Sequence, residues 1–322
     1  MYKALQRLLS VCVCILLMAG VLFARSMPKS GAANNSILSL YDAFGYQKKG
    51  TVLDWGFAVL IHYNGKTILF DTGNDADKFA HNVKALGVDL RKVDFAVLSH
   101  RHPDHVSGFE YALRQKPSIK AYVPDDVALG APDEFKYSHE TNEQLAGVPP
   151  EQLYFGGKNK SMLYKPGSIL AHAHAEYVGE SKQIAPGIFL IYTVSPLVGD
   201  FNAYPPREPG HPELSGLPEI SLALQTKKGI VLITGCSHSK VERIVAATKE
   251  FTHSNIELVD GGFHLLPYDE AYIKELAKKM KNEMGVHRVA PAHCTGNLAF
   301  KIFRELYGSD YSYAGVESIV SF

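Results

Sequence analysis

The sequence predicts an α/β protein in which helices cover β-sheets. Short apolar runs alternate with segments whose apolar residues recur every three to four positions, a pattern typical of layered α/β folds. Five of the apolar runs lead directly into histidine, cysteine or aspartate residues. Because ligand sites in open α/β sheets gather at the carboxyl ends of strands, we expect these five strand ends to meet at one site.

The first half of the chain contains the clearest elements. Residues 57–62 and 66–70 are apolar runs around a glycine-containing turn and predict a β-hairpin. Residues 76–86 have helical periodicity, and the continuous apolar run 93–99 predicts a strand buried on both faces. A helix is expected from Pro103, because proline suits the first position of a helix.

The second half repeats the alternation. Strands are expected at residues 230–234, 256–259 and 287–290. A helix should follow each of them, the first opened by a capping box that starts at Ser239 and the last by an N-cap at Thr295. Residues from about 125 to 220 are less regular and contain two Pro-Pro pairs. A segment of that length is either a lid over the site or a surface insertion.

The N-terminus predicts export. Lys3 and Arg7 precede the apolar run 8–23, and small residues follow at the spacing of a cleavage site, so residues 1–26 are expected to be a signal peptide. The alternative is an uncleaved membrane anchor. Residues 27–322 are expected to form one domain, periplasmic or secreted, with no stable membrane span once the signal is removed. The sequence leaves the oligomeric state open.

Composition limits the partners. The chain has 33 basic and 33 acidic side chains, whereas a nucleic-acid binder would show a basic excess, so we expect a small-molecule substrate and no nucleic acid. After signal removal only Cys236 and Cys294 remain, too few for a disulfide framework. They could form one bridge, but both lie next to histidines, and a role near a metal is at least as reasonable.

The central motif follows strand 93–99 and consists of His100, His102, Asp104 and His105. Two histidines two positions apart at the end of a strand can direct both imidazoles at one cation. Asp104 and His105 begin the next helix, so they project from another direction and can hold a second cation nearby. Imidazole and carboxylate ligands favour zinc, with manganese or iron as alternatives.

Four further strand ends carry similar side chains. Asp71 follows strand 66–70, and Cys236 and His238 follow strand 230–234. His264 lies beyond strand 256–259, and His293 beyond strand 287–290. Other histidines, at positions 139, 172, 174, 211 and 253, lack such a context and are expected to be ordinary strand, loop or solvated residues.

These motifs resemble the metallo-β-lactamase superfamily. The residues that carry the resemblance are Leu69 to Gly73 and Ser99 to His105. Within the superfamily, the segments 234–238, 261–265 and 292–296 are similar to the 7,8-dihydropterin-6-methyl-4-(β-D-ribofuranosyl)aminobenzene-5′-phosphate synthase-like branch. The resemblance covers the chain from about residue 36 and implies a four-layer αββα sandwich with the metal site at one edge, between the two sheets.

The resemblance also implies roles. His100 and His102 would bind the first metal, Asp104 and His105 the second, and His293 would complete the second site. Asp71 would orient a ligand histidine, as such sites generally require.

The chain departs from the superfamily pattern at Gly235-Cys236, where Gly-Asp is usual. We infer that His238 supplies the third nitrogen ligand of the first metal. Cys236 is either a bridging thiolate or a small buried residue. His264 is expected to bind substrate or transfer a proton, because the preceding glycines let substrate approach the backbone. Arg101 is a candidate for an anionic substrate group, as is Arg207.

The predicted function is that of an exported hydrolase. Two metals would activate a hydroxide that attacks an ester, lactone or phosphoester-type substrate, and Asp104, His264 and Asp71 would serve catalysis. One alternative is a transferase of the kind that the branch name implies, although export fits poorly with pterin biosynthesis. Another is a metal-binding protein without catalysis. β-Lactam hydrolysis is disfavoured, because the Gly-Cys-Ser-His turn resembles the other branch.

Overall fold

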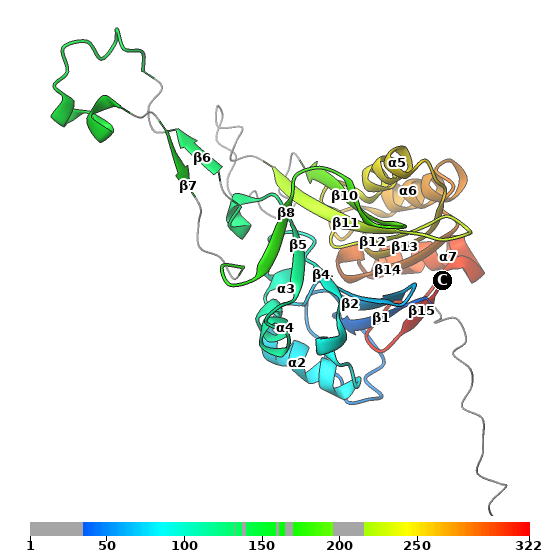
Figure 1. Cartoon of the computed structure of the whole chain (residues 1–322). Coiled ribbons are helices and arrows are strands. Elements are labelled where there is room, and N and C mark those ends of the chain that lie inside the picture. The colour runs from blue at the N-terminus through cyan, green and yellow to red at the C-terminus, as the bar shows by residue number, and fades with distance from the viewer. Residues whose placement is uncertain (1–34, 132, 137–139, 159–160, 165–169, 196–215) are drawn as a thin grey trace, which may run out of the picture. The chain divides into compact units, whose positions relative to one another are not determined.

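Two mixed β-sheets form the centre of the fold (Figure 1). The computed structural model describes residues 35–322, except 132, 137–139, 159–160, 165–169 and 196–215. The first sheet has the strand order β15-β1-β2-β3-β4-β5-β8. Its strands are β15 (Ile319–Ser321), β1 (Ser36–Tyr41), β2 (Ala58–Tyr63), β3 (Lys66–Phe70), β4 (Phe95–Val97), β5 (Lys120–Pro124) and β8 (His174–Val178).

The second sheet has the order β14-β13-β12-β11-β10-β9. Its strands are β14 (Arg288–Ala292), β13 (Ile256–Gly262), β12 (Ile230–Thr234), β11 (Leu217–Gln225), β10 (Ile188–Ser195) and β9 (Lys182–Ala185). A separate two-stranded ribbon pairs β6 (Asp133–Lys136) with β7 (Ser161–Tyr164). Strands β3, β4 and β5 run parallel to one another, as do β12, β13 and β14.

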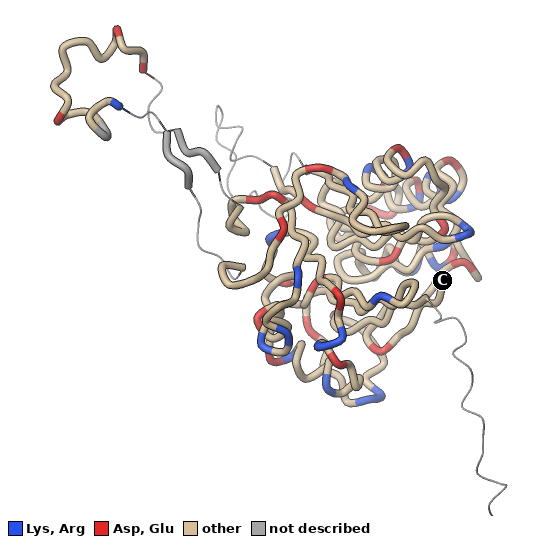
Figure 2. Tube along the Cα trace, viewed as in Figure 1, with Lys and Arg blue, Asp and Glu red and all other residues tan. Residues whose placement is uncertain are grey.

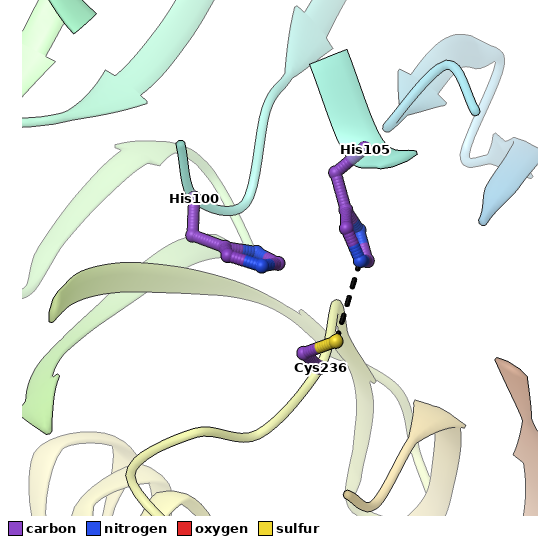
Figure 3. A group of neighbouring side chains, drawn as sticks. All are labelled: His100, His105 and Cys236. Carbon is purple, nitrogen blue, oxygen red and sulfur yellow. Dashed lines mark hydrogen bonds between the residues drawn. The ribbon is translucent and has the colours of Figure 1, made fainter. Parts of the chain in front are cut away.

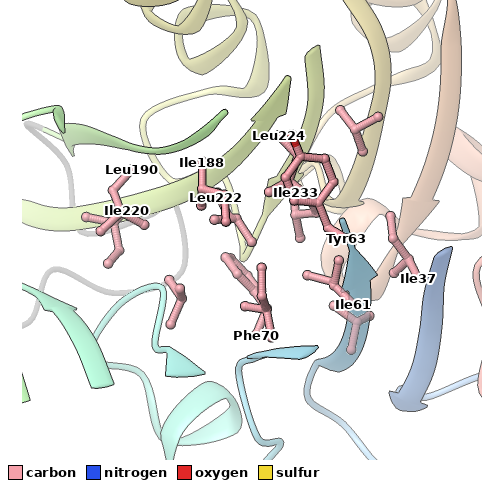
Figure 4. Packing of buried hydrophobic residues seen from close by; sticks show 14 of the residues in the cluster. Ile37, Ile61, Tyr63, Phe70, Ile188, Leu190, Ile220, Leu222, Leu224 and Ile233 are labelled. Carbon is pink, nitrogen blue, oxygen red and sulfur yellow. The ribbon is translucent and has the colours of Figure 1, made fainter. Parts of the chain in front are cut away.

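The two sheets pack face to face through a layer of aliphatic and aromatic side chains (Figure 4). Ile61 and Phe70 from the first sheet lie opposite Leu222 and Ile233 from the second, and all four are buried. Their alternation along each strand places every second side chain in this layer. Burial of a side chain of this size contributes about 1.5–3 kcal/mol relative to its exposure.

Helices cover the outer face of each sheet. The first sheet packs against α2 (Ala76–Ala85), α3 (Pro103–Val106) and α4 (Phe109–Gln115). The second sheet packs against α5 (Val241–Thr252), α6 (Glu270–Asn282) and α7 (Asn297–Tyr307). Single 3₁₀ turns connect some of these elements: Leu90–Lys92, Val127–Leu129, Pro150–Gln152, Tyr154–Gly157, His293–Thr295 and Gly308–Asp310. The expected four-layer αββα sandwich is therefore confirmed.

Some local expectations are wrong for physical reasons. The helix expected from Pro103 begins there but is divided into α3 and α4 at Ser107 and Gly108. Glycine is required at this division, because a Cβ at residue 108 would lie 2.0 Å from the carbonyl oxygen of Thr72. Ser239 does not cap α5, because the helix starts after Lys240 and has no side-chain cap. Thr295 does not cap α7 either. Its hydroxyl donates to the carbonyl of Ala292.

The segment 125–220 contains more regular structure than its composition indicates. Strands β8, β9 and β10 lie in it, and β8 and β10 extend the two main sheets. Residues 196–215 lie outside the described residues, so the prediction of a lid stays a prediction. Acidic and basic residues are interspersed along the chain in Figure 2, in keeping with the neutral balance. None of the described helices is long and apolar enough to cross a membrane.

Candidate metal centre

The five predicted strand ends meet at one edge of the sandwich. Asp71 follows β3 and His100 follows β4 in the first sheet, whereas Cys236 follows β12 and His293 follows β14 in the second. Each parallel group directs its carboxyl ends to the same edge, and the two sheets face each other there. His264 follows β13, which lies between β12 and β14 in the second sheet.

One group of ligand atoms comes from His100, His102 and His238. His100 Nε2 lies 3.0 Å from His102 Nδ1 and 3.2 Å from His238 Nε2. The first two histidines come from the loop after β4, and the third comes from the loop after β12, so both sheets contribute. The three ligand atoms lie within 4.8 Å of one another, close enough to hold a single cation.

A second group consists of Asp104, His105 and His293. Asp104 Oδ2 lies 3.8 Å from His105 Nε2 and 3.3 Å from His293 Nε2. Asp104 and His105 lie in α3, which begins with Pro103. The two groups are adjacent, because the ring centroids of His100 and His105 are 4.2 Å apart.

Asp71 connects the two groups through hydrogen bonds to residues of each. Its Oδ1 accepts a hydrogen bond from the backbone N–H of Ser99 at 2.7 Å, and its Oδ2 lies 2.6 Å from His105 Nδ1. The Ser99 hydroxyl donates to Oδ2 at 2.7 Å and lies 2.9 Å from His100 Nδ1. With Nδ1 directed at the carboxylate, His105 presents Nε2 to the second group. The carboxylate therefore orients one ligand of the second group directly and one of the first through Ser99.

Gly235 allows this network to exist. A Cβ at this position would lie 2.1 Å from the Ser99 hydroxyl oxygen and 3.2 Å from Asp71 Oδ2. The end of β12 can thus approach the loop after β4 only because residue 235 lacks a side chain.

Cys236 faces the second group from the opposite sheet (Figure 3). Its Sγ lies 3.3 Å from His105 Nε2 and 3.3 Å from Cys294 Sγ, and both cysteines are free and buried. Cys236 lies close enough to His100 and His105 to hold one cation with them. It also lies close enough to His293 and Cys294 to hold a cation with those two residues. The position of Cys236 therefore suits a thiolate ligand, whereas the pair does not form a disulfide.

A family model described as the metallo-β-lactamase superfamily matches residues 55–276, more than half of the chain. The chain belongs to the metallo-β-lactamase superfamily. The resemblance expected from its motifs is confirmed.

Individual relatives refine this result. The 7,8-dihydropterin-6-methyl-4-(β-D-ribofuranosyl)-aminobenzene-5′-phosphate synthase of Methanocaldococcus jannaschii is 28% identical over 283 residues, which cover 83% of this chain and 88% of the relative. The crystal structure of Tm1679, described as a metal-dependent hydrolase of the β-lactamase superfamily, is 26% identical with a TM-score of 0.61. That likeness covers 89% of this chain and 100% of Tm1679.

A more distant structure supports the fold alone. The metallo-β-lactamase fold protein YhfI from Bacillus subtilis is 13% identical with a TM-score of 0.51, and the match covers 89% of this chain and 99% of YhfI. The superfamily fold implies that this chain binds divalent metal ions.

The donor atoms of the metallo-β-lactamase site fit such ions. Burial lowers the pKa of His100 and His238 well below the usual range and lowers that of His102 to about 4. Burial would raise the pKa of Asp104, but neighbouring His105 and His293 hold it below its usual value. The first three imidazoles are thus neutral and the carboxylate is ionised, which are the forms that bind metals. The ring nitrogens of His100, His102 and His238 face one another, and a cation bound between them would be held by all three.

His293 differs in its electrostatic environment. Burial disfavours its charged form, but the negative charges of the neighbouring Cys294 thiolate and of Asp104 raise its pKa to about 9. Its backbone N–H donates to Asp42 Oδ2 at 2.8 Å, which fixes the turn after β14.

Arg101 does not point into the histidine cluster. Its Nη1 donates to Asp126 Oδ2 at 2.8 Å in a buried ion pair, and its Nη2 donates to the carbonyl of Gly216. A protein carboxylate holds the guanidinium in this structure, and the expected contact with an anionic substrate group stays a prediction. His172, His174 and His253 are exposed, as expected. His139, His211 and Arg207 lie outside the described residues.

Sequence reasoning missed several residues that build the site. Glu219 on β11 is buried and accepts hydrogen bonds from the backbone N–H groups of His238 and Ser239, which fixes the turn that carries His238. Trp55 is 43% exposed, and its ring centroid lies 4.9 Å from that of His293 at the rim of the site. Asp42 directly follows β1 and so obeys the same strand-end rule as the five predicted positions, a signal that was present in the sequence.

Proposed function

We propose that the chain is a dinuclear metal-dependent hydrolase that cleaves an ester, lactone or phosphoester bond of a small molecule. The observation that carries the proposal is the pair of adjacent ligand groups, one of three imidazoles and one of two imidazoles and a carboxylate. Two adjacent divalent ions suit hydrolysis, because they activate both a substrate oxygen and a water molecule.

The side chains have separate tasks in this proposal. His100, His102 and His238 hold the first ion, and Asp104, His105 and His293 hold the second. We assign zinc to both positions on the nitrogen-rich ligand set, with manganese or iron as alternatives. Asp71 keeps His105 in the orientation that binds, and Cys236 is a candidate for an additional sulfur ligand.

His264 is the candidate for proton transfer. It is buried, and its ring centroid lies 4.5 Å from that of His238. It has a positive φ of 54°, a conformation that non-glycine residues adopt rarely and mainly where the surroundings impose it. This position allows the imidazole to accept or donate a proton next to a substrate held at the first ligand group.

A second candidate function is a transferase reaction. The observation in its favour is the 28% identity to the M. jannaschii synthase, which extends over most of both chains. The ligand groups above are compatible with either class, since metal ions also stabilise negative charge in group transfer. The predicted export favours the hydrolase.

Export itself is part of the proposal. The support is the basic residues Lys3 and Arg7, followed by the apolar run 8–23. Fractionation of the producing cells, with N-terminal sequencing of the mature protein, tests it: a mature chain in the cytoplasm that keeps residue 1 would contradict export.

Hydrolysis is tested with zinc- and manganese-loaded protein on bis(4-nitrophenyl) phosphate, 4-nitrophenyl acetate and a homoserine lactone. Asp104→Asn should reduce kcat/KM by a factor of at least about 100, because a ligand and its charge are lost. Asp77→Asn is the matched control: Asp77 also lies in the first turn of a helix, but on the exposed surface. It should leave activity unchanged.

Three outcomes separate the candidates. Metal-dependent turnover that Asp104→Asn abolishes, with unchanged thermal unfolding, supports the hydrolase. No turnover of any reporter, together with reaction of a pterin and a ribosylaminobenzene phosphate, contradicts it in favour of the transferase. Unfolding of Asp104→Asn in a protein with no activity indicates a structural metal.

A further inference from the structure

A cavity of about 120 Å³ opens beside the first ligand group. Its lining includes His238 and His264 from the site, the first residues of α5, and the tyrosines Tyr268 and Tyr272. This volume exceeds what one water molecule needs but is below the roughly 300–1,000 Å³ of pockets for whole ligands. The cavity therefore suits one portion of a substrate whose reacting bond lies at the metal centre.

Part of the lining, formed by Lys240, Tyr268 and Tyr272, is aromatic and carries a positive charge. The rings of Tyr268 and Tyr272 stack with centroids 4.2 Å apart and planes inclined by 16°. Lys240 Nζ lies 5.7 Å from both centroids, within the range of a cation–π contact. The stack and the ammonium group thus lie together on one side of the cavity.

The positive charges on this wall lack protein counterions. Lys240 and Arg243 both line the cavity, and neither pairs with a carboxylate in the part of the chain that the structure describes. The nearby Ser239 also lines the cavity and is buried, but its side chain and its backbone N–H both interact with the Glu219 carboxylate, so Lys240 and Arg243 are the donors left for a ligand.

The start of α5 adds to the positive electrostatic potential of the cavity. The helix begins at Val241, which also lines the cavity, so its N-terminal N–H groups and the positive end of its dipole lie there. Glu242 is the one acidic side chain of the lining, against two basic ones. The wall therefore favours an anion over a cation.

We propose that this cavity is a substrate subsite for a flat aromatic ring that bears an anionic oxygen group, a phosphate or a carboxylate. The ring packs on the tyrosine stack, and the anionic oxygens accept hydrogen bonds from Lys240. The inference deepens the proposed function, on which it rests, by naming the class of substrate that the metal centre receives.

Calorimetric titration of the full-length, zinc-loaded protein tests the subsite. The probes are phenyl phosphate, benzoate, inorganic phosphate and phenol. Lys240→Gln should raise the Kd of phenyl phosphate about tenfold, because a charge-assisted hydrogen bond is lost. Tyr272→Leu should raise it several-fold, by loss of the stack, without changing the Kd of inorganic phosphate. Lys278→Gln, an exposed lysine of α6 outside the cavity, should leave every Kd unchanged.

Comparison of the probes identifies the anion. Tighter binding of phenyl phosphate than of benzoate assigns a phosphate group, and the reverse assigns a carboxylate. Phenol that binds as tightly as both would overturn the proposal, as would unchanged affinities in Lys240→Gln. Lys240 is exposed, so its substitution does not endanger folding and remains decisive if Tyr272→Leu fails to fold.

Failure of the subsite and failure of the proposed function are distinguishable, because calorimetry requires no turnover. Lys240-dependent binding in a protein that cleaves no reporter keeps the subsite and rejects the hydrolase. Reporter cleavage, together with ligand binding that does not depend on Lys240, keeps the hydrolase and rejects the subsite.

Discussion

Substitution of Asp71 by asparagine perturbs the metal centre without removing any metal ligand. Asp71 is fully buried, and its two oxygens accept from three donors: the Ser99 N–H at 2.7 Å, the Ser99 hydroxyl at 2.7 Å and His105 Nδ1 at 2.6 Å. Asparagine has nearly the same shape but only one accepting oxygen. In either orientation its NH₂ group faces a donor, the Ser99 N–H in one case and His105 Nδ1 in the other.

The structure sets the magnitude of the effect. One buried donor left unsatisfied reduces the free energy of unfolding by about 1–3 kcal/mol. Loss of the carboxylate that orients His105 should weaken metal binding by a factor of about 10–100 at the second ligand group. The first group should be less affected, because Asp71 reaches His100 only through Ser99.

Competition with a chromophoric chelator measures both metal affinities, and urea unfolding measures stability. Asp94→Asn is the control, since this carboxylate is partly exposed and pairs with Lys66, so its loss should change stability by less than about 1 kcal/mol. Unchanged affinity for the second metal in Asp71→Asn would refute the role assigned to the carboxylate.

Three further predictions follow from buried positions. Gly235→Ala should destabilise the protein by about 1–3 kcal/mol in urea unfolding, because its Cβ would meet the Ser99 hydroxyl; wild-type stability would contradict the close approach. Glu219→Gln replaces one accepting oxygen by a donor, so the metal content at the His238 group should fall with little loss of helix signal, as measured by elemental analysis and circular dichroism. Burial and the neighbouring Asp42 raise the pKa of Asp260 from 3.8 to about 8, so the folded state holds a proton that the unfolded state has lost. The free energy of unfolding should therefore decrease between about pH 4 and 8, by up to about 1.4 kcal/mol per pH unit, and Asp260→Asn should flatten this dependence; identical pH profiles would contradict the assignment.

The sequence was most informative where ligands lie close together in the chain. His100, His102, Asp104 and His105 occupy one loop and the first turn of α3, so a local pattern sufficed to predict that they meet. Distant partners such as His293 were found because they share a simple topological property, a position directly after a buried parallel strand.

Residues that act through non-local backbone contacts escaped prediction. Glu219 is an acidic residue in a largely apolar strand, and nothing near it in sequence reveals that it accepts from the turn after β12. The same contact explains the wrong capping box, because Glu219 takes the N–H of Ser239 before α5 begins. The ion pair of Arg101 was not foreseen for a similar reason, since its partner Asp126 comes from beyond β5.

Anomalous diffraction from crystals of the metal-loaded protein, collected at the absorption edge of the bound element, tests the two-metal assignment most directly. We expect two peaks per chain, one bounded by His100 Nε2, His102 Nδ1 and His238 Nε2 and the other by Asp104, His105 and His293. A single peak held by the two cysteines, Cys236 and Cys294, would contradict it.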